Sequence, residues 1–87
     1  MNVKLYCYRK GAEVLRKEIA KLERQKSKIS DELLTMTDEN SSVRQRANKR
    51  MRLAQIGEDI RHKEVQVGAI NELIAEETKT SRPPTSN

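Results

Sequence analysis

Apolar residues in the first half of the chain recur at alternating intervals of four and three positions. The members of this first seam are Leu15, Ile19, Leu22, Lys26, Ile29, Leu33 and Met36, of which only Lys26 is polar. Positions three and four apart lie on one face of a helix, so this spacing is the a/d pattern of a coiled coil. Extending the pattern backwards adds Ala12, Tyr8 and Leu5. The spacing predicts a helix over residues 12–37 that packs against another helix.

Residues 1–11 precede this helix and admit two interpretations. Gly11 weakens a helical extension, because glycine loses more backbone freedom in a helix than any other residue. The stretch from Val3 to Tyr8 is rich in β-branched and aromatic residues, which suits an extended conformation. The segment is therefore either an extension of the helix or an N-terminal arm.

A second seam with the same spacing occupies the later part of the chain. Its members are Leu53, Ile56, Ile60, Lys63, Val67, Ile70 and Ile74. Residues 37–42 are polar and separate the two seams, which predicts a turn. Ser42 and Gln45 have the form of a capping box, so a second helix is expected to begin at about residue 43.

The start of this second helix has a different apolar face. Its apolar residues lie nearly opposite the second seam at 100° per residue, and they are Val43, Ala47, Met51 and Ala54. Either the helix breaks near Asn48, or this part of it faces something other than the first helix.

Two seams joined by a polar turn predict an all-α fold, a coiled-coil-like antiparallel two-helix hairpin over residues 12–77. Two registers are open. One of them sets Lys26 opposite Lys63, where two ammonium groups would repel each other and lose hydrating water. A tighter turn at residues 38–42 moves Lys26 towards Leu53 and avoids this repulsion.

The end of the chain, residues 78–87, is predicted to be a disordered tail. It contains both prolines, Pro83 and Pro84, and no apolar residue follows Ala75. A segment of this composition buries too little apolar surface to offset the entropy of ordering.

A single seam between two helices is a thin core. The chain has no Phe or Trp and only two Tyr, and domains of this size commonly need a further stabilising contact. We therefore expect the hairpin to form a homodimer or higher oligomer, or to dock on a larger protein. Apolar residues outside the two seams are available for such a contact, and they are Val14, Leu34, Val65, Ala69 and Leu73.

Positive charge is concentrated at the start of the second helix. The chain has 18 Lys and Arg against 13 Asp and Glu, a net charge of +5, and five of the cations fall within residues 44–52: Arg44, Arg46, Lys49, Arg50 and Arg52. Cations at a helix N-terminus oppose the macrodipole, which favours a functional reason for the cluster. An acidic protein surface and a nucleic-acid backbone both suit such a cluster.

These features favour a small non-enzymatic protein-binding module that acts as an adaptor, an assembly factor or a steric inhibitor. The five cations are its predicted charged contacts, and Tyr6 and Tyr8 are its predicted apolar anchors, because amphipathic aromatics are frequent in protein interfaces. The alternative is a nucleic-acid-binding protein that uses the cluster at residues 44–52.

The sequence offers little for catalysis, cofactors or metals. It contains no glycine-rich phosphate loop and no recognisable nucleophile with its base, so no catalytic, cofactor-binding or metal-binding residue is predicted. His62 is the only histidine, with Asp59 three positions before it. The single cysteine, Cys7, permits no internal disulfide, and no stretch approaches 18 apolar residues. A cytoplasmic protein without membrane contact is expected.

Overall fold

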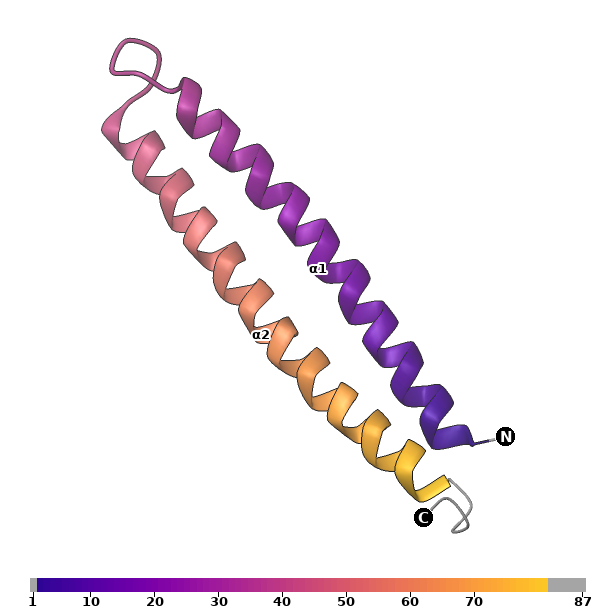
Figure 1. The fold of residues 1–87 in the computed structure, drawn as a ribbon. Coiled ribbons are helices and arrows are strands. Elements are labelled where there is room, and N and C mark those ends of the chain that lie inside the picture. Colours follow the sequence, from indigo (N-terminus) through magenta and orange to yellow (C-terminus); the bar gives the residue numbers. More distant parts are fainter. Residues whose placement is uncertain (1, 82–87) are drawn as a thin grey trace.

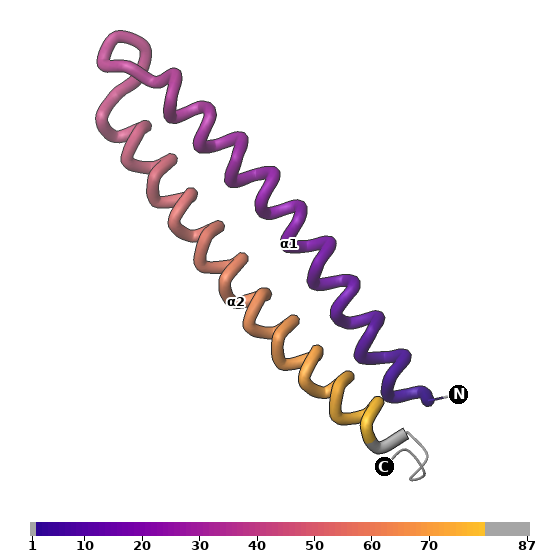
Figure 2. The backbone as a smooth tube through the Cα atoms, in the orientation of Figure 1, coloured from indigo at the N-terminus to yellow at the C-terminus, as the bar shows by residue number. Residues whose placement is uncertain are grey.

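In the computed structural model the chain folds as an antiparallel pair of helices, α1 (Val3–Thr35) and α2 (Val43–Ser81). The structure describes residues 2–81, and the side chains of residues 2–79. The helices lie side by side along their length, as Figures 1 and 2 show, and the molecule measures 71 × 17 × 16 Å. The predicted all-α hairpin is therefore confirmed.

The first helix begins at Val3, so residues 3–10 extend it rather than form an arm. Asn2 caps this end: its Oδ1 accepts a hydrogen bond from the Leu5 N–H at 3.1 Å, and its Nδ2 donates to Glu77 Oε1 of α2 at 3.1 Å. Ala12 is fully buried, which continues the first seam into the extension. Packing against α2 therefore outweighs the weak helix propensity of this segment.

Side chains close the turn between the helices. Asn40 Nδ2 donates to the Thr35 carbonyl at 3.0 Å, and the Thr37 N–H donates to Asn40 Oδ1 at 2.7 Å. At the start of α2, the Ser42 N–H donates to Gln45 Oε1 at 2.8 Å, and the Gln45 N–H donates to Ser42 Oγ at 3.1 Å. This reciprocal pair is the predicted capping box, and α2 begins directly after it.

The helices adopt the register of the tighter turn. Lys63 Nζ lies 3.0 Å from Glu18 Oε2, while Lys26 lies beside Leu53 and Ala54. Each lysine therefore avoids the other. Lys26 is exposed and Gln25 is half-buried in its place, because the ammonium group keeps its water when the neighbouring amide turns inward.

The second helix does not break near Asn48, and Figure 2 shows it running without interruption. Upstream of Leu53, Arg46 and Lys49 are half-buried, whereas Val43 and Met51 are 73% and 64% exposed. The apolar residues at the start of α2 thus face away from α1, which was one of the two predicted outcomes.

The core is narrow. Within the described residues only Ala12, Ile56 and Ile60 are buried apolar side chains, at 0%, 4% and 8% exposure. The other apolar seam residues are half-buried. The described helices contain no stretch long and apolar enough to cross a membrane.

The helical boundary near the end of the chain lies later than the sequence suggested. α2 continues to Ser81, so the first four residues of the predicted tail at 78–87 are helical. Thr78 helps to extend the helix, because its Oγ1 donates to the Ile74 carbonyl at 2.7 Å. The rest of the predicted tail lies outside the described residues.

Gly57 offers a stability test of this packing. A Cβ added there would meet nothing within 4 Å, so Gly57→Ala should raise the free energy of unfolding by up to about 1 kcal/mol through helix propensity alone. Urea denaturation followed by circular dichroism measures the change. Ala20→Gly, at an exposed position of α1, should lower the free energy of unfolding by a similar amount. A Gly57→Ala variant less stable than the parent would contradict the open space at this position.

Candidate partner-binding surface at the turn

The five cations of residues 44–52 divide into two groups in the structure. Arg46 and Lys49 lie on the face of α2 that packs on α1, where they continue the second seam. The other three, Arg44, Arg50 and Arg52, are exposed. The cluster that the sequence presents as one unit therefore has an internal part and an external part.

Arg46 stabilises the turn through hydrogen bonds from its guanidinium group. Its side chain is only 14% exposed, and its Nη1 donates to the Thr37 carbonyl at 2.9 Å, the Ser41 carbonyl at 3.1 Å and Ser41 Oγ at 3.0 Å. Its Nη2 donates to Asp38 Oδ1 at 2.7 Å. The planar guanidinium thus supplies a donor to the Ser41 carbonyl and a further donor to the Thr37 carbonyl, which also accepts from the Ser41 N–H and hydroxyl. Its contacts give Arg46 a structural role.

Lys49 joins the two helices near the turn. Its ammonium group donates a hydrogen bond to Glu32 Oε2 of α1. This hydrogen bond, with the positive charges of Lys49 and Lys28, lowers the pKa of Glu32 below its usual value. Glu13 on α1 likewise has a lowered pKa, chiefly because Lys17 donates a hydrogen bond to it.

These two carboxyls predict an acid-sensitive hairpin. A carboxyl with a lowered pKa in the folded state stabilises the fold above its unfolded pKa of about 4.3, and this contribution is lost as pH falls through the folded pKa. The thermal midpoint should therefore fall as the pH drops below about 4.3, and fall less in Glu32→Gln. Circular dichroism melts at pH 7 and pH 3 measure this, with Glu39→Gln in the turn as control. Equal acid sensitivity of both variants would contradict the role of Glu32.

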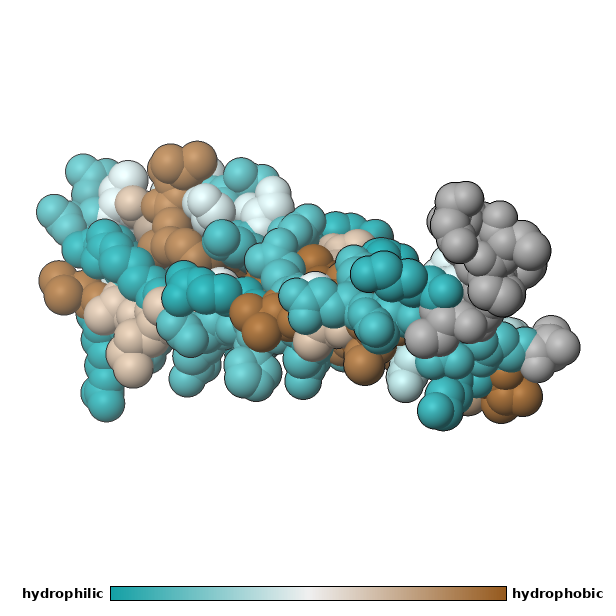
Figure 3. Space-filling model, turned by 60° about the horizontal axis from the view of Figure 1, so that its bottom comes forward, coloured by the Kyte–Doolittle hydropathy of each residue, from teal (hydrophilic) through white to brown (hydrophobic). Residues whose placement is uncertain are grey.

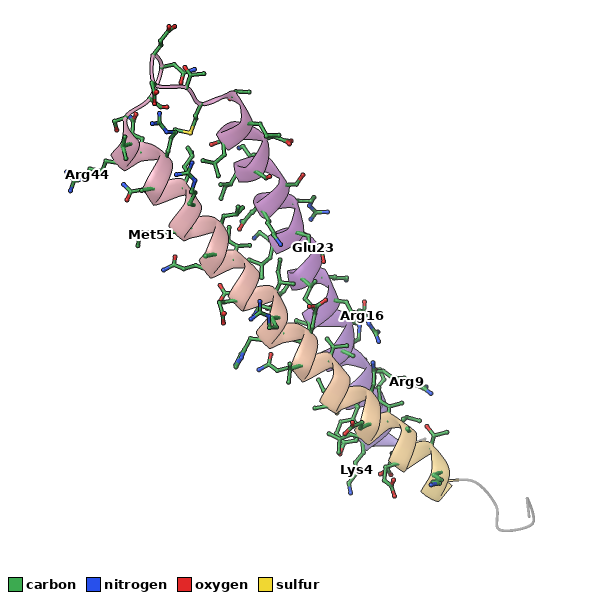
Figure 4. The ribbon with its side chains drawn as sticks, turned by 60° about the vertical axis from the view of Figure 1, so that its left-hand side comes forward. Lys4, Arg9, Arg16, Glu23, Arg44 and Met51 are labelled. Atoms are coloured by element: carbon green, nitrogen blue, oxygen red, sulfur yellow. The ribbon has the colours of Figure 1, made fainter. Side chains whose placement is uncertain are left out.

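Exposed cations and exposed apolar side chains both occur at the turn end of the rod. The structure shows no ion pair for Arg44, Arg50 or Arg52 within its described residues. Leu34 at the end of α1 is 82% exposed, and Val43 is 73% exposed. Figure 4 shows Arg44 pointing away from α1. We call this set the turn-end surface, defined by Leu34, Val43, Arg44, Arg50 and Arg52.

Two shallow grooves bring further cations beside this surface. Lys26 of α1 joins Arg50 and Arg61 along one groove of about 410 Å³. Lys28 of α1 joins Arg52 and Asn48 along another of about 390 Å³. Lys26, Lys28 and Arg61 could not be predicted as neighbours of the cluster from the sequence, because only the helix register shows which part of α1 lies beside it.

The predicted aromatic anchors do not join this surface. Tyr6 is 52% exposed and Tyr8 is half-buried in the seam. Both lie near the start of α1, and Figure 1 places that end of the rod far from the turn. The structure thus separates Tyr6 and Tyr8 from the cations with which they were predicted to act.

A larger apolar groove lies near the two chain ends. It has a volume of about 640 Å³ and is lined partly by Gly11, Val14, Ala69 and Ile70. Figure 3 shows that apolar side chains also reach the surface elsewhere, separated by polar ones. Apolar contact area is therefore spread over the rod rather than gathered at the turn.

Few reactive side chains gather anywhere on the described part of the chain. His62 and Cys7 are exposed, and within residues 2–79 no three His, Cys, Asp or Glu side chains are grouped closely enough to hold a metal ion. None of the protein-family models, curated proteins or solved structures compared with the chain matches it.

Proposed function

We propose that this chain is a non-enzymatic protein-binding module that uses its turn-end surface to cover part of a larger, acidic protein. One observation carries the proposal: Arg44, Arg50 and Arg52 are exposed without ion pairs in the described structure, at the same end of the rod as the exposed Leu34 and Val43. Arginine together with exposed apolar side chains is typical of protein interfaces. The steric action is that of an adaptor, an assembly factor or an inhibitor.

The surroundings of the turn favour a protein over a nucleic acid. Asp31, Asp38 and Glu39 lie at the same end of the rod and are exposed, and they oppose a phosphate backbone and an acidic protein surface alike, so the exposed apolar side chains have to distinguish the two. Leu34 and Val43 would gain little from a phosphate backbone but would be buried against an apolar patch. A partner with carboxylates around such a patch matches both kinds of group.

Nucleic-acid binding is the second candidate, favoured by the groove that Lys28, Asn48 and Arg52 line. Cations there could follow a phosphate backbone while Asn48 reached a base edge. Titration with duplex DNA and duplex RNA at two salt concentrations distinguishes the candidates. Binding that weakens steeply with salt would favour this second function.

The thin core also supports self-association, since only three apolar side chains are buried within the described residues. We place the protein in the cytoplasm, because an exposed free thiol at Cys7 suits a reducing compartment.

The test is a charge reversal at the turn end. A variant with Arg44→Glu, Arg50→Glu and Arg52→Glu is compared with a control that carries Lys4→Glu, Arg9→Glu and Lys21→Glu, three exposed cations of α1. Both change the net charge equally. A protein captured from the native host by the parent and the control should be lost by the turn-end variant, with helicity by circular dichroism unchanged. Equal capture by both variants would overturn the proposal.

A further inference from the structure

The second helix carries another row of residues at intervals of three and four, outside the seam, and part of this row borders the groove that Lys26 of α1 also lines. We call it the outer face of α2, defined by Met51, Ala54, Glu58, Arg61, Val65 and Gly68, and all six are exposed. Met51 and Val65 are 64% and 67% exposed, and Figure 4 shows Met51 projecting away from α1. A helix with such a row on each side has apolar contacts to offer to two neighbours.

The first helix has no comparable row. Its positions opposite the seam include Lys10, Glu13, Lys17 and Arg24, which are charged and exposed. Glu13 forms ion pairs there with Lys10 at 3.8 Å and Lys17 at 3.2 Å. This side of α1 is a solvated surface, so the unpartnered apolar row belongs to α2.

The outer faces of two copies are complementary when the two α2 helices lie antiparallel. Against a second copy in antiparallel orientation, Met51 meets Gly68, Ala54 meets Val65, and Glu58 meets Arg61. Each large apolar side chain thus lies opposite a small one, so the two faces can interdigitate. Within one copy Arg61 Nη1 already lies 3.3 Å from Glu58 Oε1, so the two-fold arrangement brings two such pairs together at its centre, each cation beside a carboxylate of both copies.

The distribution of charge along α2 selects the same orientation. Among residues 44–52, Arg44, Arg50 and Arg52 are exposed and there is no acid, whereas the exposed Glu72 and Glu76 lie near the other end of the helix. An antiparallel partner places the basic end of one helix beside the acidic end of the other. A parallel partner would place both basic ends together, which is unfavourable.

Gly68 supports a close helical neighbour. Within one copy, a Cβ added at Gly68 would meet nothing within 4 Å, so the hairpin itself gives no packing reason for a residue that weakens a helix. Met51 of a second copy would fill the space beside it.

From these observations we propose that two copies of the chain form an antiparallel homodimer through the outer faces of α2. The occupant of this face is a second copy of the same hairpin, and the two turn-end surfaces lie at opposite ends of the assembly. The inference gives a definite face and register to the self-association proposed above.

The first experiment measures mass in solution by light scattering or sedimentation equilibrium. The parent should have twice the chain mass of 10.0 kDa, and Met51→Glu with Val65→Glu should reduce it to one chain mass. Val14→Glu with Leu34→Glu, at exposed apolar positions of α1, is the matched control and should remain dimeric. A parent of one chain mass, or a dimeric outer-face variant, would overturn the proposal. Circular dichroism checks that each variant is helical.

The second experiment tests the register. Glu58→Arg alone sets arginine against Arg61 of the second copy, and Arg61→Glu alone sets carboxylates together, so each should dimerise at least 10-fold more weakly than the parent. An equimolar mixture should restore dimerisation, because each opposed pair then has opposite charges. A mixture no stronger than the single variants would overturn the register. Capture by the turn-end surface is measured separately, so either proposal can fail alone.

Discussion

Replacing Ile60 with alanine is expected to lower the free energy of unfolding by about 2–5 kcal/mol, the range for large-to-small changes at buried sites. Ile60 is 8% exposed and is one of only three buried apolar side chains among the described residues. Small domains have a total stability of roughly 5–15 kcal/mol, and a narrow core has few neighbours that can close the cavity. Urea denaturation at 25 °C, followed by the helical signal, measures the loss.

The control for this prediction is Val43→Ala. Val43 is 73% exposed at the start of α2, so removing its methyl groups should change stability by less than about 0.5 kcal/mol. Equal losses in the two variants would mean that Ile60 is not in the core between the helices.

Arg46→Ala should lower the free energy of unfolding by about 2–3 kcal/mol, the second-largest effect that the structure predicts. The guanidinium makes hydrogen bonds to two turn carbonyls, to Ser41 Oγ and to Asp38, and hydrogen bonds to a charged group contribute about 1.5–3 kcal/mol. Alanine removes the donor to the Ser41 carbonyl and to Asp38, while the Thr37 carbonyl keeps the Ser41 N–H and hydroxyl. Amide hydrogen exchange at residues 36–42 should accelerate together with the loss of stability.

Two further variants isolate the geometry of this contact. Arg46→Lys keeps the charge but presents a single ammonium group in place of a planar fork, so it should recover only part of the loss. Arg44→Ala removes an exposed cation without a described ion pair and should be nearly neutral. A stability loss for Arg44→Ala as large as that for Arg46→Ala would show that net charge, rather than the turn contacts, controls stability.

The hairpin followed from the sequence because two seams with one spacing, joined by a polar turn, can bury each other in few ways. The capping box of Ser42 and Gln45 could also be predicted, since it depends only on two residues that lie three positions apart in the sequence. Whether residues 3–10 are helical or extended could not be predicted from the sequence, because local propensity and long-range packing favour different structures there. Asn2 and Ala12 decide in favour of the helix through contacts with α2.

The division of the basic cluster could not be predicted from spacing alone. Arg46 and Lys49 continue the second seam backwards, but cations in a seam position give no apolar signal. Their place became evident only with their partners, the turn carbonyls and Glu32. The distance between Tyr6 and the cluster is likewise a product of the fold, because a hairpin places the start of its first helix at the end opposite the turn.

The contact between Asn2 and Glu77 places both described ends of the hairpin together, at the end of the rod opposite the turn. Tension applied between these two residues would act across the seam instead of along it. The interhelical layers would then be loaded one after another, from Asn2 and Glu77 towards Lys49 and Glu32, and each would separate before the next carried the load. A pull between the turn and either of these ends would load one helix along its axis. The molecule should therefore unzip at low force when held by Asn2 and Glu77.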